Sequence, residues 1–301
     1  MLDPSVPRVS SAFLALLLAA CSDGAPTSEA PASIPPSADE SNMASVEPSA
    51  ATPDFVLVAI GDSIPYNLED DCPGCTGFVD SYGAALETEV GEPVAVLNWS
   101  RHDGARTIDV LEQLESDENL LAELATADVV VMSVGFNDQP PFADSHEGCP
   151  PPSSDAVSDL AETGAATSQT CIDTVLPLIR EQIADVFARL REAAPDAAIG
   201  VLTAYDSWRG WPALDEVDPA ARDGLYAAVT YWLQQWNAAQ CQEAEAVGAV
   251  CVDVYHAFNG PDGTEPPGSF VAADYTHPSQ EGNDVIRDLL VNAGLVDRLG
   301  S

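Results

Sequence analysis

Three side chains of this sequence could together carry out nucleophilic catalysis. Ser63 directly follows an apolar run, in the motif Gly61-Asp62-Ser63, and Asp274 precedes His277 by three residues near the C-terminus. A serine hydroxyl is a poor nucleophile until a base removes its proton. In an Asp-x-x-His turn, the carboxylate can accept the Nδ1 proton of the imidazole and leave Nε2 to face the serine. The residues therefore predict Ser63 as nucleophile, His277 as base and Asp274 as its orienting acid.

Acyl transfer also needs hydrogen-bond donors for the oxyanion that develops on the substrate. Gly104 opens a helical stretch, so its backbone amide is not obstructed by a side chain. Asn137 follows an apolar run and can direct its carboxamide N–H into the same crevice. We expect both groups to serve as oxyanion donors.

The elements that must position these groups alternate along the chain. Short apolar, β-branched runs predict strands, whereas longer periodic patterns between them predict helices. The expected strands cover 55–60, 94–98, 129–134, 198–203 and 250–254, and the expected helices 77–90, 106–125 with a break, 172–194, 219–247 and 279–295. Segments 138–170 and 255–278 are expected to be long loops, which in a compact domain are usually functional.

Such alternation favours an α/β fold, with a parallel sheet covered by helices on both faces. Ligand-binding groups gather at the carboxyl ends of the strands in sheets of this kind. Ser63, Gly104 and Asn137 each follow a predicted strand, and His277 follows the last one. We therefore expect them to meet at one edge of the sheet.

Four blocks in this order resemble the motif blocks of the SGNH hydrolases, also called GDSL-type lipases and esterases. They are Gly61-Asp62-Ser63, Gly104, Gly135-x-Asn137-Asp138 and Asp274-x-x-His277, and the resemblance covers essentially residues 54 to 295. It implies a flavodoxin-like three-layer α/β/α sandwich with a five-stranded parallel sheet in the order 2-1-3-4-5. It also implies hydrolysis of carboxylic esters without a metal or organic cofactor.

Carried over by position, the resemblance makes Ser63, His277 and Asp274 a catalytic triad. The backbone amides of Ser63 and Gly104, with the Asn137 side chain, would form the oxyanion hole. Two features depart from the usual pattern: Ile64 replaces a leucine, and Arg101 and His102 surround Gly104 in an uncommon way. Neither removes a functional atom, so these departures bear on substrate preference.

The N-terminus predicts export. A short apolar run ends in Leu18-Ala19-Ala20-Cys21, which resembles the bacterial lipobox, so we expect 1–20 to be a lipoprotein signal peptide and Cys21 to be lipidated. An ordinary signal peptide with an incidental cysteine is the alternative. Residues 21–53 are rich in Ser, Pro and Ala and predict a disordered tether. The hydrolase domain would then occupy 54–301, exported and held at the membrane by its lipid alone.

The formal net charge of -39 argues against a nucleic-acid partner, because such a surface repels phosphates. The expected partner is a small-molecule or lipid ester, and we expect a monomer. Six cysteines besides Cys21 are consistent with three disulfides in an oxidising compartment. Proximity favours Cys72–Cys75, Cys149–Cys171 and Cys241–Cys251, although Cys72-Pro-Gly-Cys75 could instead be a redox motif.

Other polar and aromatic residues have simpler interpretations. His102, His146 and His256 lack metal-ligand spacing and read as surface or loop histidines, so no metal site is expected. The run Glu69-Asp70-Asp71 could bind calcium, but in so acidic a chain such runs are usually solvated. Asp62 is expected to brace its loop through backbone amides.

Tryptophans divide into two pairs. Trp208 and Trp211 could form an aromatic wall for an acyl chain or sugar, or simply pack beneath a loop. Trp232 and Trp236 have the spacing of a helix face that packs in a core.

Two classes of function remain at this level. The first is a surface-tethered esterase or lipase, or within the same family a carbohydrate O-deacetylase. The second is a catalytically silent lipoprotein that uses the pocket to bind a ligand. The presence of Ser63, His277 and Asn137 together favours the enzyme, because ligand binding does not require all three.

Overall fold

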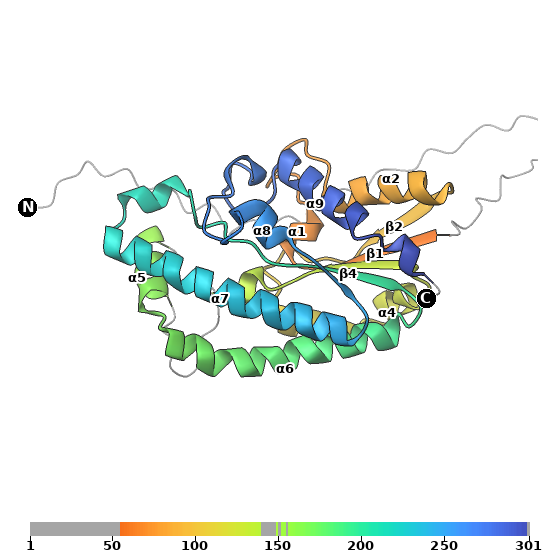
Figure 1. Ribbon diagram of the computed structural model, residues 1–301, viewed down its shortest axis with the longest axis horizontal. Helices are drawn as coiled ribbons and strands as arrows, with labels where there is room; N and C mark the ends of the chain where they lie inside the picture. Colours follow the sequence, from red (N-terminus) through yellow and green to blue (C-terminus); the bar gives the residue numbers. More distant parts are fainter. Residues whose placement is uncertain (1–54, 140–148, 150–151, 155, 300–301) are drawn as a thin grey trace, which may run out of the picture. The chain divides into compact units, whose positions relative to one another are not determined.

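The computed structural model describes residues 55–139, 149, 152–154 and 156–299. The predicted signal peptide, the tether with Cys21, and His146 lie outside the described residues. Figure 1 shows the chain coloured along its sequence.

A five-stranded parallel sheet forms the middle of the domain. Its strands are β1 (Phe55–Gly61), β2 (Val94–Asn98), β3 (Val129–Ser133), β4 (Ala198–Leu202) and β5 (Val250–Val252). Their order is β2-β1-β3-β4-β5, and every pair is parallel. The strand positions predicted from the apolar runs are confirmed. The strand order implied by the family resemblance is confirmed as well. A parallel sheet in this order places the carboxyl ends of all five strands at one edge.

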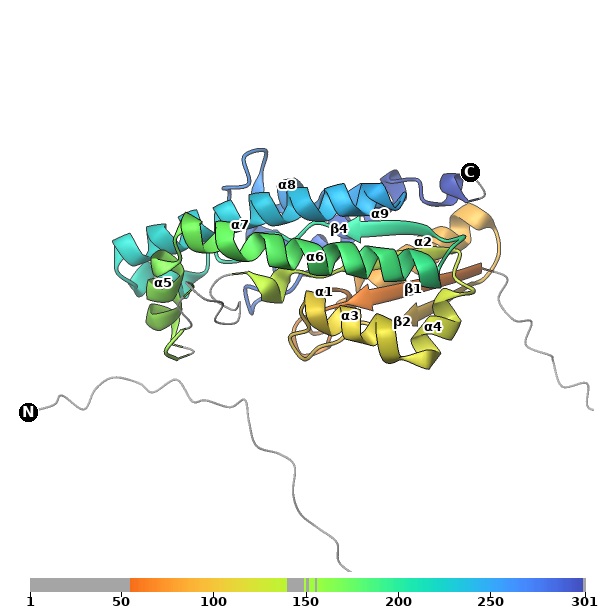
Figure 2. The same ribbon diagram turned by 90° about the horizontal axis from the view of Figure 1, so that it is seen from below.

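Helices cover both faces of the sheet (Figures 1 and 2). One face carries α2 (Phe78–Val90), α8 (Val254–Asn259) and α9 (Gln280–Asn292). The other carries α3 (Thr107–Ser116), α4 (Glu118–Leu124), α6 (Gln169–Ala193) and α7 (Pro219–Ala246), with α5 (Val157–Ala166) packed on α7. Among the described residues no helix is both long and apolar enough to cross a membrane. The three-layer architecture predicted from the alternation is confirmed.

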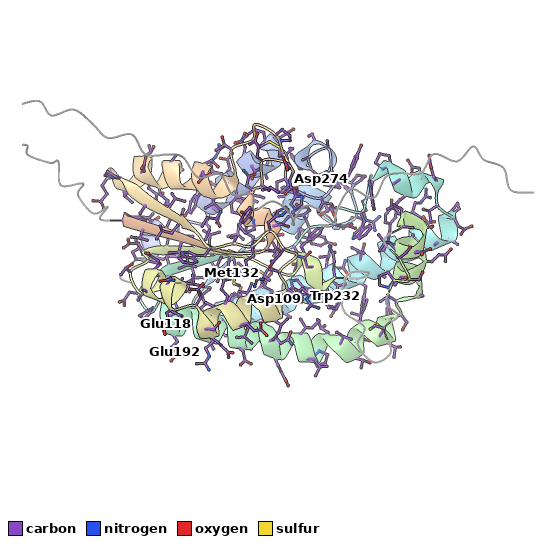
Figure 3. The ribbon with its side chains drawn as sticks, turned by 180° about the vertical axis from the view of Figure 1, so that it is seen from behind. Asp109, Glu118, Met132, Glu192, Trp232 and Asp274 are labelled. Atoms are coloured by element: carbon purple, nitrogen blue, oxygen red, sulfur yellow. A yellow bond between two sulfur atoms is a disulfide. The ribbon has the colours of Figure 1, made fainter. Side chains whose placement is uncertain are left out.

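Two hydrophobic cores lie on the two sides of the sheet. Val58 and Ile60 of β1 face one core, whereas Leu57 and Ala59 face the other, as the alternation of side chains along a strand requires. Trp232 and Trp236 stack at 5.8 Å between ring centroids within the first core, so their predicted core role is confirmed. Trp232 on α7 and Met132 in β3 can be found in Figure 3.

Both segments predicted as long loops contain helices, so those predictions were wrong. The first holds α5 and the start of α6, and the second holds α8 and a 3-10 turn at Gly268–Phe270. Gly164 of α5 explains the first error: a Cβ there would lie 2.2 Å from the Leu225 side chain of α7. Glycine lowers helix propensity but permits this close approach, so tertiary packing overrides the local signal.

Disulfides join Cys72 to Cys75, Cys149 to Cys171 and Cys241 to Cys251. This is the pairing predicted from proximity in the sequence. The first bridge lies within the loop between α1 (Ser63–Tyr66) and α2.

Candidate active site

Ser63 begins a short helix directly after the central strand β1. The Asp62 carboxylate caps this helix by accepting the backbone N–H of Ile64 at 3.1 Å. Gly61 makes the turn with φ of +146°, and a Cβ at this position would lie 1.8 Å from the carbonyl oxygen of Ser133 on β3. Only glycine fits here, so the sharp turn that presents Ser63 depends on Gly61.

Asp62 is fully buried beside the serine. Burial raises the pKa of Asp62 to about 7, although the Ile64 N–H and the nearby His277 both act to lower it. The predicted bracing role of Asp62 is confirmed by its bond to Ile64. Asp62 and His277 each affect the pKa of the other, so residues from the two ends of the domain sequence lie near each other here.

His277 and Asp274 form the pair that their spacing predicts. The Asp274 carboxylate oxygen Oδ2 lies 2.5 Å from His277 Nδ1, while Oδ1 accepts the backbone N–H groups of Thr276 and His277. Burial alone would lower the pKa of His277, but the Asp274 hydrogen bond and charge raise it above its usual value. Burial would likewise raise the pKa of Asp274, but its hydrogen bonds lower it.

The His277 ring is therefore held in one orientation by Asp274. Its Nε2 atom is buried and has no hydrogen-bond partner among the described residues. The loop that carries it is tied to the end of β4, because the Tyr205 hydroxyl donates to the carbonyl oxygen of Thr276 at 2.7 Å. Asp274 is labelled in Figure 3.

The two predicted oxyanion donors lie next to each other. A Cβ at Gly104 would be 3.9 Å from Asn137 Oδ1, and Gly104 has the positive φ of +76° that favours glycine. Asn137 Nδ2 donates one hydrogen bond to the carbonyl oxygen of Ala105 at 2.9 Å, which fixes the orientation of the carboxamide. The second hydrogen of Nδ2 can still be donated to a substrate.

Asp138 holds these two donor loops together. Its Oδ2 atom accepts both the backbone N–H and the hydroxyl of Thr107, each at 3.0 Å. Burial raises the pKa of Asp138 to about 6, against the effect of these hydrogen bonds. The loops after β2 and β3 are thus fastened to each other beside Gly104 and Asn137.

Sequence reasoning missed two neighbours of His277. Asp71 Oδ2 lies 2.8 Å from His102 Nε2 and 3.5 Å from His277 Nδ1, and the His102 and His277 rings stack at 5.9 Å between centroids. His102 lies in a loop and is one third exposed, as expected, whereas Asp71, which was expected to be solvated, is largely buried against the two imidazoles. The unusual residues around Gly104 were the only signal, and nothing in the sequence linked them to Asp71.

A second Asp-x-x-His pair shows that this spacing alone does not identify a buried functional site. Asp253 Oδ2 contacts His256 Nδ1 at 2.7 Å, and Asp253 also accepts the His256 backbone N–H. Both side chains are about half exposed, and Asp253 serves as the N-cap of α8. His256 is therefore a surface residue, as predicted.

Only one of the two tryptophans considered for an aromatic wall has a side chain that a substrate could reach. Trp208 is 4% exposed and belongs to the core, so it offers no face to a substrate. Trp211 is half-buried against it, with ring centroids 5.6 Å apart. Trp211 alone stays a candidate for substrate contact.

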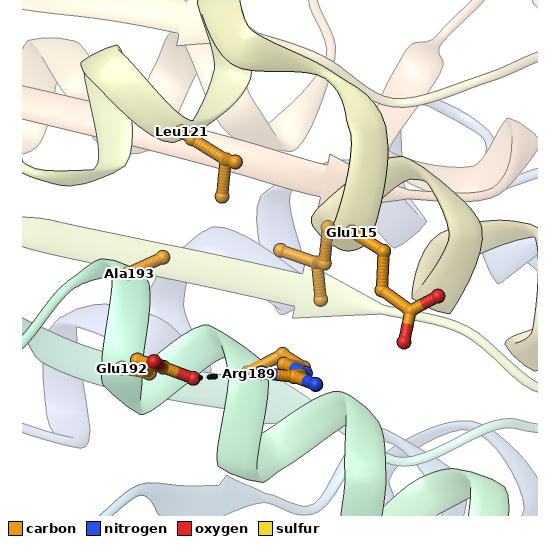
Figure 4. Close-up of a pocket in the computed structure, with 6 residues that line it drawn as sticks. Glu115, Leu121, Arg189, Glu192 and Ala193 are labelled. Atoms are coloured by element: carbon orange, nitrogen blue, oxygen red, sulfur yellow. Dashed lines mark hydrogen bonds and ion pairs between the residues drawn. The ribbon is translucent and has the colours of Figure 1, made fainter.

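A separate hollow of about 510 Å³ lies between α3, α4 and α6 (Figure 4). Its lining residues are Leu114, Glu115, Leu121, Arg189, Glu192 and Ala193, none of which is a predicted site residue. Arg189 is already paired with Glu192 at 3.0 Å. This hollow therefore has no connection with the chemistry above.

Three solved structures with a similar fold are described as lipases, one of them as a putative lipase. The chain is similar to the lipase Lip_vut3 from a goat rumen metagenome, with 17% identity over 80% of this chain and 98% of that one, and a TM-score of 0.58. It is also similar to an extracellular lipase from Streptomyces rimosus, with 20% identity over 79% and 99%, and a TM-score of 0.55. A putative GDSL-like lipase from Parabacteroides merdae matches with 16% identity over 80% and 96%, and a TM-score of 0.53. At these identities the likeness shows the fold.

Sequence comparison gives the family. No curated protein matches the chain. The model of the GDSL-like lipase/acylhydrolase family matches residues 59–285, a span that begins before Ser63 and ends after His277. The chain therefore belongs to the GDSL-like lipase/acylhydrolase family, whose members are hydrolases with the SGNH fold.

Proposed function

We propose that this protein hydrolyses carboxylic esters through Ser63, His277 and Asp274. The single observation that carries the proposal is the Asp274–His277 contact of 2.5 Å, which orients a buried imidazole in the same site as Asp62 and the adjacent Ser63. Family membership supports the reaction class.

In this mechanism His277 Nε2 takes the proton of the Ser63 hydroxyl as the oxygen attacks the ester carbonyl. The Asp274 carboxylate stabilises the imidazolium that forms. The amides of Ser63 and Gly104, with the Asn137 carboxamide, donate to the oxyanion of the tetrahedral intermediate. His277 then protonates the leaving alcohol, and a water molecule that it deprotonates releases the acid from the acyl-enzyme.

The substrate is proposed as a small or lipid ester. Of the two tryptophans considered for an aromatic wall, Trp211 is the one that could contact an acyl chain or a sugar. We further propose that the protein is exported, anchored through a lipid on Cys21, and active as a monomer. The three disulfides support export, because such bridges persist in oxidising compartments.

Hydrolysis of p-nitrophenyl esters from acetate to palmitate tests this function. The purified protein and its Ser63→Ala variant would be compared at equal concentration. We expect the wild type to turn over one range of chain lengths and the variant to be inactive. If neither protein hydrolyses any ester of the series, the ligand-binding alternative becomes the better account. An activity limited to acetyl esters would favour the O-deacetylase alternative.

A further inference from the structure

Asp71, His102 and His277 form a cluster whose chemistry differs from that of a catalytic triad. Each offers one ligand atom, and these atoms all lie within 4.8 Å of one another. The residues come from three separate segments: the loop after α1, the loop after β2, and the loop before α9. One carboxylate and two imidazoles are the donors that divalent transition metals prefer.

The distances suit a metal ion at the centre of this cluster. Bonds of about 2.0 to 2.2 Å in tetrahedral geometry place neighbouring ligand atoms roughly 3.3 to 3.5 Å apart. Asp71 Oδ2 is already 3.5 Å from His277 Nδ1. Its 2.8 Å contact with His102 Nε2 is a hydrogen bond that would open by about half an ångström when an ion replaces the proton.

The three ligands are held by the structure rather than left to fluctuate. Asp71 precedes the Cys72–Cys75 disulfide. The His102 loop is fixed by the Arg101 backbone N–H, which donates to the Gly61 carbonyl oxygen at 2.9 Å. His277 donates its own backbone N–H to Asp274. The backbone of the three segments is therefore held in place, which lowers the entropic cost of binding, and the ion has only to displace Asp274 from His277 Nδ1 and the proton between Asp71 and His102.

The site is also accessible and electrostatically suitable for a cation. The side chains of Asp71, His102 and His277 are 17%, 33% and 15% exposed, so an ion can reach them from solvent. The negative charges of Asp62 and Asp274 act on the same imidazole.

We propose that Asp71, His102 and His277 bind one divalent transition-metal ion, for which Zn²⁺ is the probe. Bound metal blocks catalysis, because the ion and Asp274 compete for His277 Nδ1, and a metal-bound imidazole cannot act as the base. This second part rests on the proposed esterase function. The site would thus make ester hydrolysis sensitive to transition metals that no catalytic step requires.

Calorimetric titration of the purified protein with ZnCl₂ tests the binding without any assay of activity. Excess Mg²⁺ in the buffer occupies surface carboxylates, which it prefers over nitrogen ligands. The test variants are His102→Ala and Asp71→Asn. The matched controls are His256→Ala, from the exposed Asp–His pair, and Asp70→Asn, the exposed neighbour of Asp71. Thermal unfolding of each variant confirms that it is folded.

We expect one Zn²⁺ ion per chain, with affinity at least tenfold lower in both test variants and unchanged in both controls. The wild type and controls should also lose ester hydrolysis in Zn²⁺ and recover it with a chelator. If the wild type binds Zn²⁺ no more tightly than the His102→Ala variant, the proposed metal site is refuted. A protein that binds Zn²⁺ as expected but hydrolyses no ester leaves the metal site standing and refutes the esterase.

Discussion

Replacing Asp62 with asparagine should make the protein progressively more stable relative to the wild type as the pH rises. Asp62 is fully buried, and its pKa rises from 3.8 to about 7 because burial disfavours its charge. Asparagine keeps the oxygen that accepts the Ile64 N–H but has no charge to bury. Its Nδ2 group replaces the buried Oδ2, which has no hydrogen-bond partner among the described residues, and this adds a cost that does not depend on pH. The change of the stability difference with pH therefore reports the cost of ionising Asp62 in the folded state.

The direction with pH follows from proton linkage. A carboxyl whose pKa is raised on folding holds its proton more tightly in the folded state, so the free energy of unfolding falls as pH rises between the two pKa values. At about 1.4 kcal/mol for each pH unit, the cost to the wild type reaches roughly 4 kcal/mol above pH 7. The advantage of Asp62→Asn should grow by about 2 to 3 kcal/mol between pH 5 and pH 8.

Thermal unfolding at both pH values measures this effect. For a domain of this size 1 kcal/mol corresponds to about 2 to 4 °C, so the melting-temperature difference between Asp62→Asn and the wild type should move in favour of the variant by roughly 4 to 12 °C between pH 5 and pH 8. The exposed neighbour Asp70→Asn is the control and should change little at either pH. A stability difference that stays the same between pH 5 and pH 8 would refute the assignment of a buried, costly charge at Asp62.

Three further substitutions test other parts of the site. Asn137→Ala removes one oxyanion donor, so kcat should fall about 100- to 1,000-fold with little change in KM, as steady-state kinetics would show. Gly61→Ala would set a Cβ 1.8 Å from the Ser133 carbonyl oxygen at a φ of +146°; we expect insoluble or unfolded protein, and a variant with wild-type melting temperature would disprove the close approach. Asp71→Asn removes a negative charge that helps to raise the pKa of His277, so the acidic limb of the kcat/KM profile should move to lower pH; an unmoved limb would contradict that role.

Much of the fold could be predicted because its signals are local and repeated. Apolar runs such as Val129–Ser133 are too short for helices, and they alternate with long periodic segments such as α7. Helix α5 was missed because Gly164 and Thr163 weaken its local signal. Its stability comes from packing on α7, which no local pattern shows.

The candidate site divides in the same way. Ser63, Gly104, Asn137 and the Asp274–His277 pair could be predicted because each has a recognisable motif after a strand. Asp71 and His102 could not, because their contact joins residues 31 positions apart in two loops without regular structure. The choice between a wall and core packing for Trp208 stayed open because the sequence does not show which side of a loop is buried.

Labelling with a fluorophosphonate, followed by peptide mass spectrometry, tests the central claim most directly. The reagent reacts with an activated serine hydroxyl. The test therefore does not require knowledge of the acyl chain or the alcohol of the natural ester. Our account predicts one phosphonyl group per chain, on Ser63, and little labelling of His277→Ala. Wild-type protein that stays unlabelled, or that carries the group on another serine, would contradict it.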